Sequence, residues 1–273
     1  MKKKIIGFGI AGNFAHHLEQ AGESEDFIGV EVDSEDAPKG IFPTYIPHEN
    51  GFLGIYPFST DSISFIDDKN IQMEPEVALR CSISYDKNRD ISSLIPLSFM
   101  AYNDCSIRVE GAKKISHKKN WGKNSKGISN QEIVIDKFTK GGVMDQYSLT
   151  SFIKRDNRVI QYGENSELLG YSYFYEKLQQ WIINKLNTQK EQGPLENLKS
   201  LIKIAQYPKE LLISIGATRY TPFGEKNFLE IDDTIFVIVY NHTLYKHDDI
   251  IKMVETEIFN KKSLSILKQK IIK

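Results

Sequence analysis

Short β-prone runs separated by turn residues constrain the fold of this chain more than any other feature. Apolar and β-branched residues predict a first strand over residues 5–10, and similar runs follow throughout the chain. These further runs cover 63–66, 77–84, 97–102, 132–138, 148–154, 157–161, 211–216 and 234–240. Residues 33–50 are rich in turn formers and predict a loop or flap. Many short strands with few helices indicate an α+β fold that is mostly β, with a closed or rolled sheet.

Helical periodicity is limited to three stretches. Apolar residues recur at helical spacing over 168–187 and, more briefly, over 195–205. The amphipathic segment 248–273 ends in lysine-rich turns and predicts a C-terminal surface helix. We therefore divide the chain into an N-terminal strand with a histidine-containing helix and lid (1–50), a β-roll domain (51–245) and the C-terminal helix (246–273).

Composition excludes several classes of protein. The net charge of −1 gives no basic surface for nucleic acid. No apolar run approaches the roughly 20 residues that cross a bilayer, and the first apolar run is too short for an export signal. Two cysteines, Cys81 and Cys105, are too few for a disulfide framework and fit a reducing cytoplasm.

The spacing of Gly7, Gly9 and Gly12 imitates a dinucleotide-binding fingerprint. That motif requires a strand, a helix and a second parallel strand that ends in an acidic residue. Here an acidic stretch and a proline-rich segment follow instead. Nucleotide binding is therefore a distant alternative.

The most specific chemical signal is a pair of carboxylates at the start of a predicted strand. Glu74 and Glu76 are two residues apart, so on a strand they project to the same side. Asp104 follows the next predicted strand. A buried all-oxygen set of this kind suits a hard divalent cation. A solvated pair of glutamates at a strand end is the alternative.

The carboxylates belong to a longer series of motifs. Residues 103–108 are similar to an Asn-Asp-x-Ser-x-Arg motif, and residues 73–79 match a Glu-x-Glu-Leu pattern. Further matches follow in order at 12–17, 52–60, 121–127, 155–165, 211–218 and 229–235. Together these segments resemble the fumarylacetoacetate hydrolase family from about residue 6 to residue 240.

This resemblance implies a rolled mixed β-sheet, a bound Mg²⁺ ion (or Ca²⁺ or Mn²⁺) and a homodimer. Glu74, Glu76 and Asp104 would hold the metal. Reactions of the family share an enolate or carbanion stabilised beside a carbonyl, which a divalent ion chelated by a 2-oxo carboxylate favours. We therefore expect a cytoplasmic hydrolase or lyase that acts on a small 2-oxo or 1,3-dicarbonyl acid. Acylpyruvate-type carbon–carbon cleavage and oxaloacetate-type decarboxylation are the leading reactions.

His17 is the candidate general base, because a histidine titrates close to neutrality. Family members that cleave carbon–carbon bonds carry a glutamate three residues after this histidine, where this chain has Gln20. Glu19 is the adjacent carboxylate, and pairing it with His16 restores the spacing. The sequence leaves open which histidine is the base. Two histidines on a surface helix are the alternative.

Four further residues are candidates for contact with substrate. Lys126, or alternatively Lys123, would place a cation beside the developing oxyanion. Gln161, Thr218 and Arg108 would bind substrate oxygens. A solvated loop lysine and a polar residue at a strand end are the alternatives for Lys126 and Gln161.

The chain also departs from the family pattern. Besides Gln20, it has Tyr56 where the family often carries a lysine, and Ala217 where a Gly-Thr-Pro strand is usual. These changes motivate a second hypothesis, a non-catalytic relative that keeps the fold for a binding or structural role.

Overall fold

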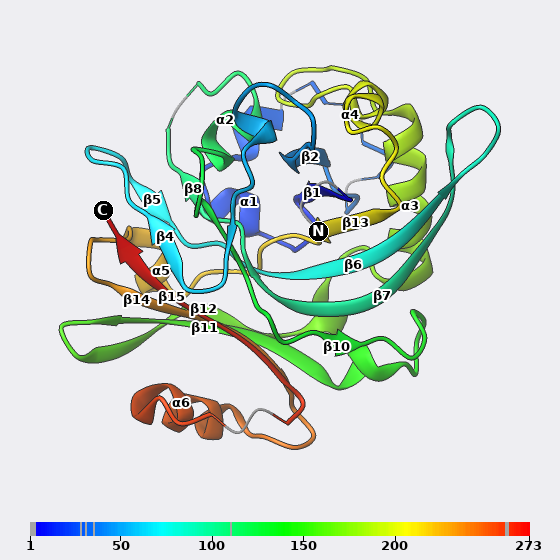
Figure 1. The fold of residues 1–273 in the computed structure, drawn as a ribbon. Helices are drawn as coiled ribbons and strands as arrows, with labels where there is room; N and C mark the ends of the chain where they lie inside the picture. Colours follow the sequence, from blue (N-terminus) through cyan, green and yellow to red (C-terminus); the bar gives the residue numbers. More distant parts are fainter. Residues whose placement is uncertain (1–3, 28, 31, 35, 110, 260–261) are drawn as a thin grey trace.

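Two curved β-sheets packed against each other form the body of the protein in this computed structural model (Figure 1). The structure describes residues 4–27, 29–30, 32–34, 36–109, 111–259 and 262–273. The strands are β1 (Ile5–Ala11), β2 (Gly40–Tyr45), β3 (Phe58–Ser59), β4 (Ser62–Ser64), β5 (Ile71–Gln72), β6 (Pro75–Tyr85), β7 (Ile91–Asn103), β8 (Ser106–Ile107), β9 (Lys126–Ile128), β10 (Ile133–Val134), β11 (Tyr147–Arg155), β12 (Arg158–Glu167), β13 (Glu210–Ser214), β14 (Thr234–Asn241) and β15 (Leu264–Ile272).

The larger sheet has the strand order β2-β1-β13-β6-β7-β9-β3, and β10 also pairs with β7. The second sheet has the order β12-β11-β14-β15-β4, and β5 pairs with β8. β1 with β13, β3 with β9 and β4 with β15 are parallel pairs, whereas the other pairs are antiparallel. This curled, mixed arrangement confirms the predicted fold class.

Six helices accompany the sheets in the described part of the chain. They are α1 (His17–Gln20), α2 (Ile115–Lys119), α3 (Tyr175–Thr188), α4 (Leu198–Ile204), α5 (Pro222–Lys226) and α6 (His247–Thr256). Figure 1 shows α6 against the outer face of the second sheet, with α2 toward the opposite end of the molecule. None of the helices within these described ranges is long and apolar enough to cross a membrane.

Alternation along β6 separates the core from the functional face. Val77 and Leu79 point into the main core, which they share with Leu149 and Val237 of the second sheet. Full burial of each such side chain contributes roughly 1.5–3 kcal/mol. Ala78 points to the other face, where α1, α2 and β2 lie. Strand alternation therefore directs the residues around β6 to two different environments.

The predicted C-terminal helix is wrong over its second half. α6 ends at Thr256, and residues 264–272 form β15, which is antiparallel to β14 and parallel to β4. Lys268 and Lys270 are exposed and alternate with buried Leu267, Gln269 and Ile271. This period of two is a strand pattern that the abundance of lysine concealed.

The predicted loop over 33–50 contains β2, an edge strand of the larger sheet. Pro43 lies within β2, and an edge strand tolerates a residue without an N–H donor. Since β2 is antiparallel to β1, the glycine-rich first strand does not begin a parallel β-α-β unit.

Both cysteines are buried and unpaired, as small apolar residues would be.

Candidate active site

Three buried carboxylates meet where β6 begins and β7 ends. These strands pair with Pro75 opposite Asn103, so Glu74 and Asp104 lie side by side, and the Asp104 amide donates to the Glu74 carbonyl (3.0 Å). Glu76 follows Pro75 on β6. One carboxylate oxygen from each of Glu74, Glu76 and Asp104 lies within 4.8 Å of the other two. We call this group the carboxylate triad.

Neighbouring polar groups hold the triad in place. Asn103 Oδ1 accepts from the amides of Glu74 (3.2 Å) and Cys105 (3.1 Å), and Asn103 Nδ2 donates to Gln269 Oε1 on β15 (3.2 Å). The Gly216 amide donates to Glu76 Oε2 (3.0 Å). Gly216 has φ +110, a conformation that other residues rarely adopt. Sequence analysis did not identify Gln269, because its strand was predicted as helix.

Two lysines bring positive charge to the triad. The Lys119 ammonium, from the end of α2, forms ion pairs with Glu74 Oε2 and with Asp104 Oδ2, the latter at 2.7 Å. Lys126 Nζ lies 3.2 Å from Asp104 Oδ1 and donates to the carbonyls of Asp104 (3.1 Å) and Cys105 (2.7 Å). Lys123 is exposed, so the structure brings Lys126 to the site instead. Lys119 was not identified from the sequence because it lies in a run of lysines.

Arg108 links the triad to a fourth carboxylate. Arg108 Nη2 lies 2.9 Å from Glu74 Oε1, and Arg108 Nη1 forms an ion pair with Glu23 Oε1. Lys118 Nζ lies 2.9 Å from the same Glu23 oxygen. Glu23 is buried, although it belongs to an acidic stretch that reads as a surface turn. The burial of Glu23 could not be anticipated from that local pattern.

Charge and burial separate the two glutamates of the triad. Burial alone would raise the pKa of Glu74, but Lys119 and Arg108 hold it well below its ordinary value. Burial and the adjacent Asp104 carboxylate raise the pKa of Glu76 well above its ordinary value. Burial would lower the pKa of Lys119, but Asp104 and Glu74 raise it. The surroundings therefore act in opposite directions on the two glutamates, because cations favour the ionised form of Glu74 whereas burial and a neighbouring carboxylate oppose ionisation of Glu76.

His17 lies over this cluster as a neutral imidazole. Its Nε2 is 4.0 Å from Glu74 Oε2, and its ring centroid is 5.2 Å from that of Tyr220. Burial lowers the pKa of His17 to about 4, although Glu74 opposes the shift. Within the described residues, neither ring nitrogen has a hydrogen-bond partner. A neutral, unpartnered imidazole is available to accept a proton.

The structure does not bring the alternative pair, His16 and Glu19, into the triad cavity. Both side chains are exposed and line a neighbouring hollow of about 400 Å³, whereas His17 lines the triad cavity. Residues two apart on a helix face different directions, so Glu19 points away from His17. Glu23 provides the acidic group near His17 that Glu19 was expected to provide.

For two other predicted substrate contacts, Gln161 and Thr218, the neighbouring residue lies closer to the site. Gln161 Nε2 donates to Gly163 O (3.0 Å) on its own strand, whereas the next residue, Tyr162, packs its ring on Tyr220 at 5.8 Å. Because Arg108 Nη2 donates to the Tyr220 hydroxyl (3.0 Å), strand alternation turns Tyr162, and not Gln161, toward Arg108. Thr218 is buried, and its amide donates to Pro75 O (3.3 Å), whereas its neighbour Ala217 lines the cavity.

Buried carboxylate oxygens without hydrogen-bond partners indicate whether the triad fits a metal ion. Both carboxylate oxygens of Asp104 and Oε1 of Glu74 are buried and, among the described residues, accept no well-aligned hydrogen bond. Ammonium and guanidinium groups lie close to them, as described above, but without the geometry of a directed bond. Three carboxylates with unsatisfied oxygens are the donor set that Mg²⁺ and similar ions prefer. The residues therefore fit a hard divalent cation.

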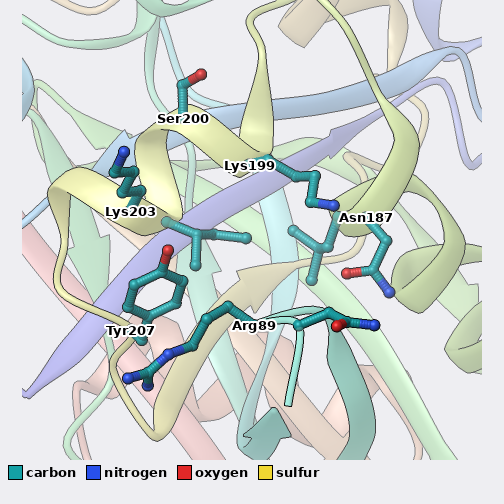
Figure 2. Close-up of a pocket in the computed structure, with 9 residues that line it drawn as sticks. Arg89, Asn187, Lys199, Ser200, Lys203 and Tyr207 are labelled. Atoms are coloured by element: carbon teal, nitrogen blue, oxygen red, sulfur yellow. The ribbon is translucent and has the colours of Figure 1, made fainter. Parts of the chain in front are cut away.

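The triad cavity is nearly filled. Its free volume is about 10 Å³, which is room for no more than about one water molecule. Figure 2 shows a separate hollow of about 220 Å³, lined by Arg89, Lys199, Lys203 and Tyr207 among others. Lys199 there pairs with Asp90 (2.5 Å), and Arg89 lies 5.0 Å from the Tyr207 ring centroid. No carboxylate is among the described residues that line this hollow.

Comparison with known proteins places the chain in a family. The sequence matches the model of a family described as "Family of unknown function (DUF5718)" over residues 23–271. The chain belongs to this family. The matched DUF5718 region includes Glu23, the carboxylate triad and Lys119. No curated protein sequence matches the chain significantly.

Solved structures share the fold over nearly the whole chain. One is a 2-keto-3-deoxy-D-arabinonate dehydratase complexed with magnesium and 2,5-dioxopentanoate, with 15% identity, a TM-score of 0.53 and coverage of 99% of this chain and 73% of that one. Another is a 5-carboxymethyl-2-hydroxymuconate delta-isomerase from Mycobacterium smegmatis, with 13% identity, a TM-score of 0.53 and coverage of 98% and 78%. These similarities establish the fold, which is the fumarylacetoacetate hydrolase-like fold that the sequence motifs resemble.

Proposed function

We propose that this DUF5718 protein is a divalent-metal-dependent enzyme that acts on a small 2-oxo or 1,3-dicarbonyl acid. The expected reaction is carbon–carbon cleavage of an acylpyruvate or decarboxylation of an oxaloacetate-type acid. The carboxylate triad beneath a neutral His17 is the observation that carries the proposal. The magnesium-bound dehydratase named above supports it, because that protein has the same fold and its ligand is a 2-oxo acid.

Each residue has a role that follows from its surroundings. Glu74, Glu76 and Asp104 would hold the ion, which when bound polarises a substrate carbonyl and favours its enolate. His17 Nε2 would take a proton from water or substrate, since the imidazole is neutral at pH 7. Lys126 and Arg108 would orient substrate oxygens by their positive charge. The buried position of these groups strengthens their charge interactions by excluding water.

Thermal unfolding with Mg²⁺, Mn²⁺ or Ca²⁺ tests the proposal, with oxalate added as an enolate mimic. An ion that binds the folded state at 100 times its Kd stabilises it by roughly 2.7 kcal/mol. Glu76→Gln removes a carboxylate of the triad and should abolish the shift. Glu255→Gln, at an exposed position on α6, is the matched control and should keep it. A panel of acylpyruvates and oxaloacetate is then followed by loss of their ultraviolet absorbance. Absence of any metal-dependent shift with or without oxalate would exclude the proposal.

A non-catalytic binding protein is the second candidate. The observation that favours it is the Lys119 ammonium, which already pairs with two of the three triad carboxylates. A non-catalytic protein should bind oxalate or a 2-oxo acid with no dependence on added metal. It should also show no turnover of any compound in the panel. Metal-dependent turnover that His17→Gln abolishes would decide for the enzyme.

A further inference from the structure

The Lys119 ammonium lies among carboxylate oxygens that would hold a metal ion. The ammonium touches Glu74 Oε2 and is 2.7 Å from Asp104 Oδ2, so it bridges two of the three triad carboxylates. The Lys119 side chain is buried, and its ammonium also lies 5.5 Å from the centroid of the Phe42 ring. A buried ammonium in this position already neutralises the carboxylates.

The formal charges of the described side chains in the site are balanced. Among the described side chains, four carboxylates (Glu23, Glu74, Glu76 and Asp104) face four cations (Arg108, Lys118, Lys119 and Lys126). A divalent ion added to this set leaves two uncompensated positive charges in a buried site, which is unfavourable. Either a cation must withdraw from the triad or an anion must enter with the metal.

The small volume of the triad cavity also requires a cation to withdraw before a metal ion can enter. The cavity beside the triad has a free volume of about 10 Å³, too small for an ion together with a chelating ligand. Lys119 lines this cavity, as do Glu74 and Glu76. Displacement of its ammonium would free both the room and the carboxylate oxygens that the ion needs.

We propose that Lys119 is the built-in cation of the triad, and that a divalent ion enters as its ammonium leaves the carboxylates to pair with a dianionic ligand. The inference rests on the proposed metal-dependent function and adds a ligand class. That class is a small acid with two negative oxygens, such as the enolate form of a 2-oxo acid or its mimic oxalate. The released ammonium compensates one of the ligand charges. Metal and ligand therefore bind together more tightly than either binds alone.

Calorimetric titration of the full-length protein with Mn²⁺ tests the inference, with and without saturating oxalate. In the wild type, oxalate should tighten Mn²⁺ binding at least about tenfold, a difference that titration resolves readily. Lys119→Met should bind Mn²⁺ at least about tenfold more tightly than the wild type without oxalate. Its response to oxalate should be correspondingly smaller.

Two variants separate contact from net charge. Lys118→Met removes the same charge from the adjacent residue, which pairs with Glu23 and not with the triad in the contacts described. It should change Mn²⁺ affinity much less than Lys119→Met does. Lys119→Arg keeps a cation and should bind Mn²⁺ no more tightly than the wild type. Equal gains in Lys118→Met and Lys119→Met would overturn the inference, because net charge alone would then control binding.

Loss of folding in Lys119→Met is also informative. The variant leaves the triad without its main counter-charge, so Mn²⁺ should restore its circular dichroism spectrum if the ion replaces the ammonium. Failure of Mn²⁺ to restore the fold would overturn the inference. If Lys119→Met binds Mn²⁺ but the wild type does not, even with oxalate, the resident role of Lys119 stands and the proposed metal-dependent activity fails. If the wild type without oxalate binds Mn²⁺ as tightly as Lys119→Met does, the resident role of Lys119 fails and the proposed metal-dependent activity stands.

Discussion

Gln20 and the backbone of Tyr220, 200 positions apart in the sequence, exchange two hydrogen bonds. The Tyr220 amide donates to Gln20 Oε1 (2.9 Å), and Gln20 Nε2 donates to the Tyr220 carbonyl (3.3 Å). Gln20 is three residues after His17, so the two side chains share one face of α1. The pair therefore fastens the helix that carries His17 to the segment following β13.

Gln20→Ala should loosen α1 without unfolding the protein. Two hydrogen bonds of about 0.5–1.5 kcal/mol each are lost, so α1 should open more often. Its amide hydrogens should therefore exchange roughly tenfold faster or more. Hydrogen–deuterium exchange of peptides that cover residues 14–22 measures this directly. Glu19→Ala, on the exposed side of the same helix, should leave exchange near the wild-type rate. Equal exchange in both variants would contradict the role of Gln20.

His17→Gln should reduce turnover of an identified substrate by about 10²–10⁴-fold, the usual contribution of a general base. The change should appear in kcat more than in KM, because the imidazole accepts a proton in the reaction and does not hold the metal. His16→Gln should stay within about threefold of the wild type, since His16 is exposed and lines a different hollow. Steady-state kinetics of both variants decide between the two histidines, and a larger loss in His16→Gln would reverse the assignment.

Glu23→Gln should destabilise the protein by roughly 2–4 kcal/mol, because Arg108 and Lys118 lose a buried counter-charge. Urea unfolding measures the change in free energy. Glu25→Gln, at an exposed position in the same segment, should remain within about 0.5 kcal/mol of the wild type. A double-mutant cycle with Arg108→Met should give a coupling energy of about 1 kcal/mol or more. Purely additive effects would show that the ion pair contributes nothing.

Glu196 should make stability fall as pH rises. Burial raises its pKa from the ordinary value to about 7 in the folded state, despite the opposing charge of Lys114. Between about pH 4.5 and 7 the native state therefore binds more protons than the unfolded state, and this stabilisation disappears above pH 7. Relative to the wild type, Glu196→Gln should gain roughly 1–3 kcal/mol between pH 5 and pH 8. Urea unfolding at both pH values checks this. Glu191→Gln, an exposed carboxylate in the same loop, should show no such gain.

Local patterns were sufficient for several of the long strands in the two sheets. The runs that predict strands over 77–84, 148–154 and 234–240 lie within β6, β11 and β14, because alternating burial is written into neighbouring residues. Pro43 and the lysines of β15 obscured two further strands, which depend on partners distant in the sequence. An edge position and a lysine-bearing face are properties of the sheet and not of the segment.

The sequence by itself determined the pair Glu74 and Glu76 and the recurrence of Asp104 after the next strand, because side-chain direction on a strand follows from spacing alone. Only the tertiary structure decided which charges surround them. Glu23 and Lys119 reach the triad from an acidic stretch and a lysine-rich stretch, and each reads locally as solvated surface. Their burial depends on long-range packing, which brings opposite charges together in a site closed to water. That packing decides whether Glu23 and Lys119 are solvated surface residues or part of the buried site.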